Sequence, residues 1–362
     1  MAEAGLKIAI DGRELAGKPT GVGRYLIEIL RVWTATEFPH RLLVITPSEP
    51  DPSIVQSLPG VAWHVEPARS AGTRWEQGRL PRALAKARPD VFFAPAYTAP
   101  LRLPCPMVVV IHDVSYFAHP EWFGRREGWR RRWLTKFTAR HARTVITDSE
   151  FSRSEIDRFL RLPAGRIVVA SIGAPAPAFT DSTREPLLLY VGSLFKRRRI
   201  PELIQAFALA APRVPSARLV LVGDNRTMPR IDPRALAQAA GLGARFEWHD
   251  YASDAVRDAL YASARGFAFL SDYEGFGLPP LEAMSHGVPS VVLDTPVSRE
   301  VYGDAALRVA PEPGAIAEAI VTLLSDDAVH ARLKAAGAER LRGYSWASTA
   351  ATVRRVLEEA AQ

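Results

Sequence analysis

The stretch from residue 267 to residue 293, FAFLSDYEGFGLPPLEAMSHGVPSVVL, constrains the fold more than any other part of the chain. Its apolar run 267–270 ends in a polar, glycine-rich loop, and two prolines then lead into a short apolar segment that stops at Gly287. Proline suits the start of a helix, and glycine suits the residue just past its end. With the second apolar run at 290–293, the pattern predicts a βαβ unit whose loop lies at the carboxyl edge of a parallel sheet, where ligands bind in open α/β folds.

Short apolar runs of this kind recur along the chain and alternate with amphipathic helical patterns. The runs expected to be strands are 7–11, 42–46, 61–65, 91–94, 107–111, 144–147, 167–172, 187–191, 219–222 and 246–249. With 362 residues, of which 48% are apolar, the chain is long enough for two cores. We therefore expect an α/β protein with an N-terminal domain (1–173), a linker (174–186), a second domain (187–344) and a final helix (345–362).

Composition narrows the class of protein. A single cysteine, Cys105, excludes an internal disulfide and a cysteine-rich metal site. No apolar run reaches the ~20 residues of a spanning helix, and no leader pattern is visible, so a cytoplasmic protein is expected. The net charge of +7 comes entirely from residues 1–180, which hold 25 Lys and Arg against 17 Asp and Glu.

Two carboxylates flank the glycine-rich loop, Glu274 before it and Glu282 in what is expected to be the first turn of the helix. The glycines let the backbone approach a ligand closely. Two separated carboxylates can accept hydrogen bonds from two sets of hydroxyls, as a polyhydroxylated ligand offers. The alternative is that Glu274 belongs to a plain turn and that Glu282 is a solvent-facing acid near the helix start.

The segment EGFGLPPLEAMSHG resembles the E-x7-E signature of retaining glycosyltransferases of family 4. The resemblance implies a GT-B architecture, in which two Rossmann-like parallel-sheet domains face an interdomain cleft and the last helix crosses back to the first domain. It also implies that Glu274 lies by the sugar of a nucleotide-sugar donor and that Glu282 holds the ribose hydroxyls. The family's donor contacts from backbone amides match Gly275, Phe276, Gly277 and Leu278.

A second loop, GRELAGKPTGVGRY, follows the first expected strand and brings Gly21 and Gly23 to the start of a helix. A strand, a glycine loop and a helix N-terminus form an anion site, although a plain flexible loop would have the same sequence. Family members carry a similar loop that touches the diphosphate of the donor. This loop, near the start of the sequence, is most similar to that of bacterial mannosyltransferases of polysaccharide assembly, so GDP-mannose is the first donor to expect.

His112 and Asp113 follow the expected strand 107–111 and so lie at the same kind of sheet edge. A histidine there can hydrogen-bond a sugar hydroxyl or handle a proton, with Asp113 orienting it. The alternative is a histidine satisfied by a backbone carbonyl. In the family, a histidine of an HD pair lies beside the donor sugar, which gives His112 a catalytic role.

Four consecutive cations, KRRR, come directly after the expected strand 187–191. They can neutralise a diphosphate leaving group, or they can simply be solvent-exposed residues at the start of a helix. The family has a lysine six residues after the glycine that ends this strand, and that position is Arg198 here, preceded by Arg197. Because arginine binds phosphate in a forked geometry that lysine lacks, which phosphate each side chain would hold stays open.

Residues 121–143, EWFGRREGWRRRWLTKFTARHAR, combine eight Lys and Arg with interleaved aromatic residues. As a helix, the segment places Trp129, Trp133, Leu134 and Phe137 on one stripe. The stripe would either pack into the domain with the arginines solvated, or lie on an anionic membrane surface.

Together with these features, the resemblance implies a retaining glycosyltransferase that works without a metal or other cofactor. Its co-substrate would be a GDP- or UDP-linked sugar, its acceptor a glycan or a lipid-linked glycan, and its mechanism a front-face attack. It would be cytoplasmic or peripheral on the inner face of the membrane, and no nucleic acid is expected as a partner. The alternatives are another GT-B enzyme, such as a nucleotide-sugar epimerase, and a non-catalytic basic protein that binds membrane or nucleic acid.

Overall fold

The computed structural model describes residues 5–17, 19, 21–69, 72–177 and 184–362. The chain divides into two compact units, the first formed by Met1–Gly173 with Ser345–Gln362 and the second by Ala174–Tyr344. Of the linker expected at 174–186, residues 178–183 lie outside the described residues. None of the helices in the described residues is both long enough and apolar enough to cross a bilayer.

The first unit is built on a parallel sheet with the strand order β3-β2-β1-β4-β5-β6-β7. Its strands are β1 (Lys7–Asp11), β2 (Arg41–Thr46), β3 (Ala62–Val65), β4 (Val91–Ala94), β5 (Met107–Val110), β6 (Thr144–Thr147) and β7 (Ile167–Val169). The strand order reverses between β1 and β4, so the loops after these two strands diverge and leave room for a ligand at the carboxyl edge. Strands β4 and β5 are fully buried, which explains why they read as continuous apolar runs.

Helices cover this sheet in the order expected for βαβ units. They are α1 (Gly21–Thr34), α2 (Pro52–Gln56), α3 (Leu80–Ala87), α4 (Ser115–Ala118), α5 (Arg125–His141), α6 (Glu150–Leu160) and, from the end of the chain, α14 (Trp346–Ala361). A turn of π-helix, Trp75–Arg79, precedes α3, so the helix expected from residue 75 begins in this wider form.

The long helix expected at 121–143 is interrupted at Gly124, where the backbone is extended, and α5 begins at Arg125. Its stripe of large aromatic residues does not pack into the domain. Trp129 is 64% exposed and Trp133 is 47% exposed, whereas Leu134 is buried. The interpretation of the whole stripe as a core contact is therefore wrong, because the face of α5 that meets the domain is made mostly of small residues: Gly128, Thr135, Thr138 and Ala139.

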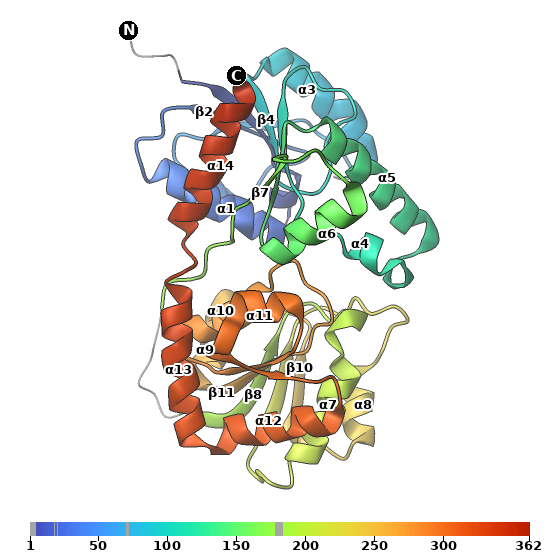
Figure 1. The fold of residues 1–362 in the computed structure, drawn as a ribbon, viewed down its shortest axis with the longest axis vertical. Coiled ribbons are helices and arrows are strands. Elements are labelled where there is room, and N and C mark those ends of the chain that lie inside the picture. The colour runs from blue at the N-terminus through green and yellow to red at the C-terminus, as the bar shows by residue number, and fades with distance from the viewer. Residues whose placement is uncertain (1–4, 18, 20, 70–71, 178–183) are drawn as a thin grey trace. The chain divides into compact units, whose positions relative to one another are not determined.

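Helix α14 belongs to the core of the first unit, where it packs against α1 and the sheet (Figure 1). Trp33 of α1 donates from Nε1 to the carbonyl of Ala350 at 3.1 Å, and Thr349 donates to the carbonyl of Ser171 at 2.6 Å. Leu357 is fully buried. The last residues of the chain therefore complete a core that the first 173 residues begin.

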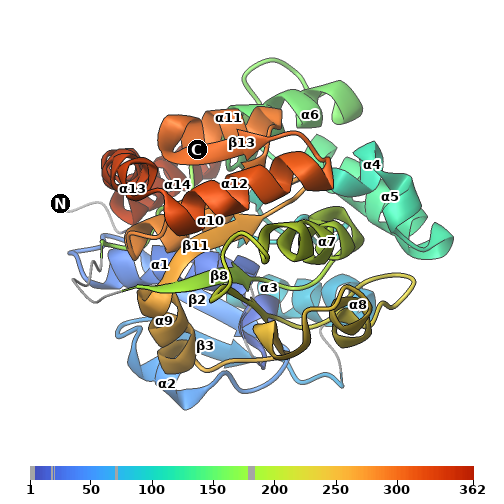
Figure 2. The ribbon, with the colours of Figure 1, turned by 90° about the horizontal axis from the view of Figure 1, so that it is seen from below.

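The second unit has a parallel sheet with the strand order β10-β9-β8-β11-β12-β13. Its strands are β8 (Glu185–Val191), β9 (Arg218–Val222), β10 (Phe246–His249), β11 (Ala264–Phe269), β12 (Ser290–Leu293) and β13 (Ala306–Val309). Its helices are α7 (Ile200–Ala210), α8 (Pro233–Ala239), α9 (Asp254–Ser263), α10 (Leu278–Ser285), α11 (Pro296–Tyr302), α12 (Pro313–Ser325) and α13 (Asp327–Leu341). Helices α7 and α12 lie side by side against one face of the sheet (Figure 2).

Strand order reverses in this sheet between β8 and β11, which pair with each other. The loop after β8 carries the arginine run, and the loop after β11 carries Glu274. The two loops are joined by a backbone hydrogen bond from Asp272 to the carbonyl of Arg197, at 2.9 Å, and by an ion pair between Arg199 and Asp272, at 2.6 Å. The topology thus brings together two motifs that are about 75 residues apart in the sequence, as open α/β sheets do at this position.

Because α14 completes the first core, Leu357→Ala is expected to lower the free energy of unfolding of the first unit by roughly 2–5 kcal/mol. Hydrogen exchange during chemical denaturation would report this as faster exchange in β4 and β5. Arg355→Ala, on the exposed side of the same helix, is the matched control and should change stability by less than about 0.5 kcal/mol. Equal effects of the two substitutions would contradict the assignment of α14 to this core.

Candidate functional site

Glu274 lies at the reversal point of the second sheet and is held by the arginine run. One carboxylate oxygen accepts hydrogen bonds from Arg198 Nε at 3.0 Å and from Ser271 Oγ at 2.9 Å, and the other lies 3.5 Å from Arg197. The three charged side chains are only 11–16% exposed. Burial by itself would raise the pKa of Glu274, but the charges of Arg197 and Arg198 outweigh it and lower the pKa to about 2.

Arg198 is fixed by aromatic rings as well as by Glu274. Its guanidinium carbon lies 4.9 Å from the centre of the Phe269 ring and 5.5 Å from that of Phe195, and its Nη1 donates to the carbonyl of Ser193 at 3.0 Å. Gly192 leaves the space that this group occupies, because a Cβ there would lie 2.5 Å from Nη1. The glycine after β8 is thus required by the position of the arginine.

Arg197 is less completely satisfied than its neighbour. Its guanidinium lies 4.5 Å from the Phe195 ring, and its Nε is buried without a hydrogen-bond partner in the described part of the chain. Two cations share one carboxylate, so the cluster of Arg197, Arg198 and Glu274 carries a net positive charge. An anion is the kind of ligand that this cluster would hold.

The glycine-rich loop ends at Gly277, which has a φ of +89° and precedes the first residue of α10. Tyr302 donates to the carbonyl of Gly277 at 2.7 Å, and a Cβ on that glycine would lie 2.1 Å from the tyrosine oxygen. Any other residue would therefore displace the loop. Because residues 279 and 280 are prolines, the first turn of α10 has backbone amides only at Leu278 and Leu281. The expected donor contacts of the amides of residues 275–278 stay a prediction.

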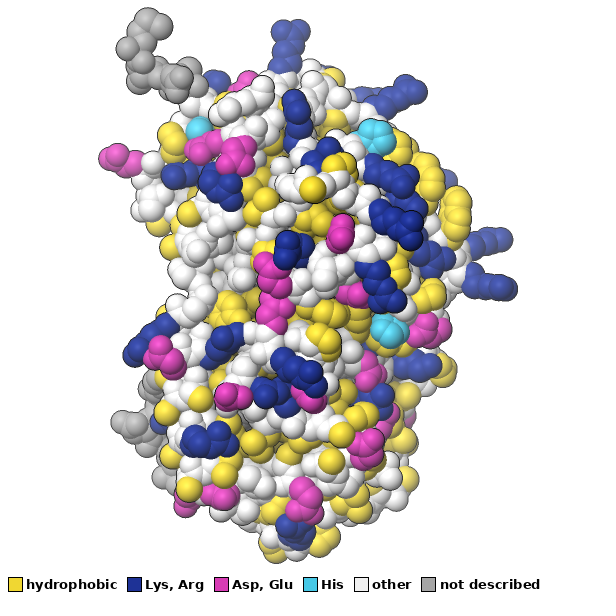
Figure 3. All heavy atoms as spheres, in the orientation of Figure 1, with side chains coloured by type: hydrophobic (Ala, Val, Ile, Leu, Met, Phe, Trp, Pro, Cys, Tyr) yellow, Lys and Arg dark blue, Asp and Glu magenta, His cyan; other side chains and the backbone are white. Residues whose placement is uncertain are grey.

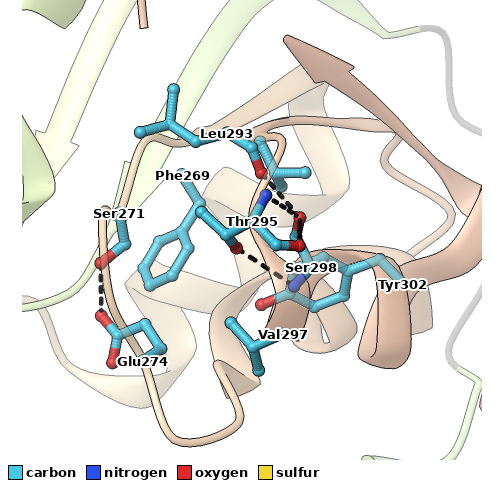
Figure 4. Close-up of a pocket in the computed structure, with 9 residues that line it drawn as sticks. Phe269, Ser271, Glu274, Leu293, Thr295, Val297, Ser298 and Tyr302 are labelled. Carbon is cyan, nitrogen blue, oxygen red and sulfur yellow. Dashed lines mark hydrogen bonds between the residues drawn. The ribbon is translucent and has the colours of Figure 1, made fainter. Parts of the chain in front are cut away.

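A small pocket opens beside this loop at the carboxyl ends of β11 and β12 (Figure 4). Glu274 and Ser271 line one side of it, and Thr295 and Ser298 line the other, at the start of α11. The latter two form a capping box, in which the hydroxyl oxygen of each residue accepts a hydrogen bond from the backbone amide of the other. The pocket has a volume of about 10 Å³, roughly the room that one water molecule needs, and it brings a carboxylate and hydroxyls close together.

Glu282 lies away from the arginine cluster. Since α10 begins at Leu278, Glu282 is in its second turn, and the expectation of a first-turn acid is wrong. The side chain is half-buried and accepts a hydrogen bond from Tyr261 at 3.3 Å. The hydrogen bond of Glu282 is thus to Tyr261, whereas those of Glu274 are to Arg198 and Ser271. The expectation that the two carboxylates do not work as one acid-base pair stays a prediction.

Gly21 and Gly23 are the first and third residues of α1. A Cβ at Gly23 would lie 2.5 Å from the carbonyl oxygen of Glu14, so this glycine is required for packing in the first unit. A Cβ at Gly21 would meet nothing within 4 Å. Of these two glycines, Gly21 is therefore the one beside open space, and the expected role of both in binding phosphate stays a prediction.

His112 follows β5 and is buried, with each ring nitrogen facing an oxygen. Nδ1 lies 2.8 Å from Asp148 Oδ2, and Nε2 lies 3.0 Å from the carbonyl oxygen of Pro95. Because both oxygens are acceptors, the geometry suits an imidazolium that donates twice. Burial by itself would lower the pKa of His112, but Asp148 raises it by its charge and hydrogen bond, and the net pKa is raised.

The side chain that orients His112 is therefore Asp148. The sequence-based expectation that Asp113 plays this part is wrong. Asp113 accepts hydrogen bonds from the Ser115 amide at 2.8 Å and from Tyr97 at 3.2 Å. Asp148 directly follows β6, which is the neighbour of β5 in the sheet. The position of Asp148 directly after an apolar run could have identified it as a site residue. Its contact with His112 follows only from the strand order, which places β6 beside β5.

Comparison with known proteins gives matches over both units. Residues 177–340 match the model "Glycosyl transferases group 1", and residues 19–175 match "Glycosyltransferase Family 4". The chain is 32% identical to the O-antigen chain mannosyltransferase B of Escherichia coli over 284 residues, or 73% of each protein. It is 30% identical to the GDP-mannose:cellobiosyl-diphosphopolyprenol alpha-mannosyltransferase of Komagataeibacter xylinus, over 65% of this chain and 60% of the relative.

Solved structures resemble the chain over almost its whole length. The sucrose-phosphate synthase of Thermosynechococcus elongatus has a TM-score of 0.79 and 19% identity, with 98% of each chain covered. Anabaena Alr3699/HepE in complex with UDP-glucose has a TM-score of 0.78 and 19% identity, covering 98% of this chain and all of the other. At this identity the likeness establishes the fold.

The contacts of His112 predict its titration. Asp148→Asn is expected to lower the pKa of His112 by at least about 1, because the variant removes the charge that favours the imidazolium. Since folding raises this pKa above 6.5, the ion pair stabilises the protein at low pH, and its contribution is lost as pH rises through the folded pKa.

Histidine ring NMR over a pH series measures this value directly. Asp113→Asn is the matched control, because its carboxylate bonds Tyr97 and Ser115 instead, and it should move the pKa of His112 much less. If Asp113→Asn moved the pKa as far as Asp148→Asn does, the assigned pair would be wrong.

Proposed function

Because the chain belongs to the group 1 glycosyl transferases of family 4 and has their GT-B fold of two Rossmann-like parallel-sheet domains, we propose that it transfers mannose from GDP-mannose to a glycan or lipid-linked acceptor. The predictions of this family, of this fold and of a glycosyltransferase are confirmed by these matches. A nucleotide-sugar epimerase and a non-catalytic basic protein are not favoured by them.

The choice of mannose and of the acceptor class rests on the relatives. The Escherichia coli relative is an O-antigen chain mannosyltransferase, and the Komagataeibacter relative is named for GDP-mannose and a diphosphopolyprenol-linked acceptor. A phosphatidyl-myo-inositol mannosyltransferase of Mycobacterium leprae is 35% identical over 34% of this chain and 34% of that relative. Mannosyl transfer is common to these names, which supports GDP-mannose over UDP-linked sugars.

The cluster of Arg197, Arg198 and Glu274 is the observation that carries the proposal. When the bond between the sugar and the phosphate breaks, negative charge develops on the nucleoside diphosphate. Cations fixed before the reaction stabilise this charge without having to reorganise. Arg198 is held by Phe269, Phe195 and Gly192, so it meets that requirement.

Donor binding would exchange partners within the cluster. The diphosphate takes the place of the carboxylate on one or both arginines, and Glu274 is then free to accept a hydrogen bond from a hydroxyl of the donor sugar. Ser271, which donates to Glu274 at 2.9 Å, keeps the carboxylate in position during this exchange. Glu282, with its separate partner Tyr261, serves the ribose hydroxyls, and the amides of residues 275–278 serve the sugar or the phosphate.

Transfer retains the anomeric configuration and proceeds by front-face attack. The acceptor oxygen forms a bond to the anomeric carbon on the face from which the phosphate oxygen leaves, and the acceptor proton passes to that phosphate oxygen. The proton does not pass to His112, because an imidazolium with both nitrogens engaged is a hydrogen-bond donor and has no free lone pair to act as a base. The leaving group is balanced by Arg197 and Arg198, and no metal ion takes part.

Two substitutions should distinguish the residues needed for donor binding from those needed for sugar transfer. Glu274→Gln is expected to lower the rate of transfer at least about 100-fold. It should leave the Kd for GDP within about threefold, since the arginines that hold the diphosphate remain. Arg198→Met should weaken GDP binding at least about tenfold, because it removes a charge-assisted contact. Calorimetry with GDP and a coupled assay for released GDP measure the two effects.

Arg199→Met is the matched control in the same run, because Arg199 pairs with Asp272 and Glu202 instead of Glu274. It should change the Kd for GDP by less than about threefold. Normal turnover by Glu274→Gln would overturn the role given to Glu274. An effect of Arg199→Met equal to that of Arg198→Met would overturn the specific role of Arg198.

The donor can be identified without knowledge of the acceptor. GDP-mannose is expected to raise the Tm more than UDP-glucose, UDP-galactose or GDP-fucose at equal concentrations, because only the correct donor makes the base and sugar contacts together. The shift should persist in EDTA if the arginines alone balance the diphosphate. A larger shift with a UDP-sugar would reject the GDP-mannose proposal, and a shift abolished by EDTA would reject metal-independent binding.

A further inference from the structure

Helix α5 presents an aromatic face to solvent that no described part of the chain covers. Trp129 and Trp133 are 64% and 47% exposed, although tryptophan is usually well buried. The opposite face of α5 meets the domain through Gly128, Leu134, Thr135, Thr138 and Ala139. A helix that is already anchored by one complete face does not need two exposed indoles for stability, so this second face calls for another explanation.

Aromatic side chains form a continuous ridge along α5, in which Trp129 and Trp133 are exposed and Phe137 is half-buried. Trp133 stacks on Phe137, with ring centres 5.9 Å apart, and Phe137 stacks on His141, at 4.0 Å. Trp129 precedes Trp133 by one helical turn and so lies on the same face. In Figure 3, apolar side chains and Lys or Arg side chains gather together over this part of the first unit.

Cations border the ridge on both sides. Glu127 is paired with Arg130 and Arg131, each at 2.7 Å. Four other exposed cations of α5 have no ion pair within the part of the chain that the structure describes: Arg125, Arg126, Lys136 and Arg140. Arg126 lies three residues from Trp129, Lys136 three from Trp133 and Arg140 three from Phe137, so each is a neighbour of an aromatic side chain on the helix surface. The outer face is therefore both aromatic and strongly positive.

We propose that this outer face of α5, defined by Arg126, Trp129, Trp133, Lys136, Phe137 and Arg140, binds the surface of an anionic phospholipid bilayer. Indole rings settle at the boundary between headgroups and acyl chains, where the ring is buried and the N–H stays hydrated. Cations beside them attract anionic headgroups, and each contributes about 1 kcal/mol at such a surface. The proposal does not depend on the identity of the donor.

Other occupants fit the face less well. Two copies of the chain would pair poorly through it, because the three cations of this face on each copy would repel those of the other. Single-stranded nucleic acid binds in positively charged grooves that follow its backbone, whereas this ridge lies on the outward side of one helix. A flat anionic surface meets such a ridge along its whole length.

Vesicle binding of the full-length chain tests the proposal. The protein should sediment with vesicles of phosphatidylcholine containing phosphatidylglycerol, and not with phosphatidylcholine alone, and the binding should weaken as salt rises. Trp129→Ala with Trp133→Ala should lower the partition coefficient at least about tenfold, through the loss of two buried rings. Arg126→Ala with Arg140→Ala should lower it roughly 30-fold, from about 1 kcal/mol for each cation.

Matched controls change the same chemistry elsewhere on the surface. Leu209→Ala removes an apolar side chain that is 52% exposed on α7, and Arg41→Ala with Arg82→Ala removes two exposed cations of the first unit. Both should leave the partition coefficient within about twofold if α5 is the binding face. Circular dichroism and GDP binding check that every variant is folded.

Three outcomes would overturn the proposal. The first is absence of binding to anionic vesicles at low salt. The second is an equal loss of binding in the α5 variants and in the controls, which would indicate a diffuse response to net charge. The third is binding of a single-stranded oligonucleotide that depends on Trp129 and Trp133 while vesicles are ignored. Quenching of tryptophan emission by brominated acyl chains, lost in the double tryptophan variant, would place these rings at the expected depth.

Discussion

The pairing of one buried carboxylate with two buried cations is the interaction on which the candidate site depends. Glu274 keeps Arg197 and Arg198 together, and its own pKa is lowered to about 2 because they surround it. Such a pair is costly to bury and is maintained only where further contacts orient it. Here these contacts are the aromatic rings of Phe195 and Phe269, and the pairing of β8 with β11 brings the two loops that carry the charged side chains together.

The fold could be predicted to a large extent because its signals are local. Buried parallel strands read as apolar runs, and glycine and proline mark the ends of helices, as in the stretch 267–293. Strand β13 was missed because ALRV is only partly buried at the sheet edge and has no continuous apolar run. The outward stripe of α5 could not be decided from periodicity, which gives the spacing of a face but not the direction in which it points.

The sequence predicts which residues belong to the candidate site better than it predicts which of them contact one another. Glu274, Arg197, Arg198 and His112 were found from their places after strands, but their partners depend on which strands are neighbours, and strand order is not written in any one segment. For this reason Asp148 was missed. Glu282 is in the second turn of α10 and not, as predicted, in the first, because the helix begins at Leu278, one residue before its two prolines.

The return of α14 to the first unit also has a consequence for synthesis. Residues 346–361 are synthesised after the whole second unit, so that unit can be complete while the first sheet still lacks helix α14. The first unit, although most of it is synthesised earlier, cannot complete its core until α14 has been made. Its nascent form exposes apolar surface for that interval, and a fusion placed at the C-terminus is attached to the first unit, not to the unit that precedes it in the chain.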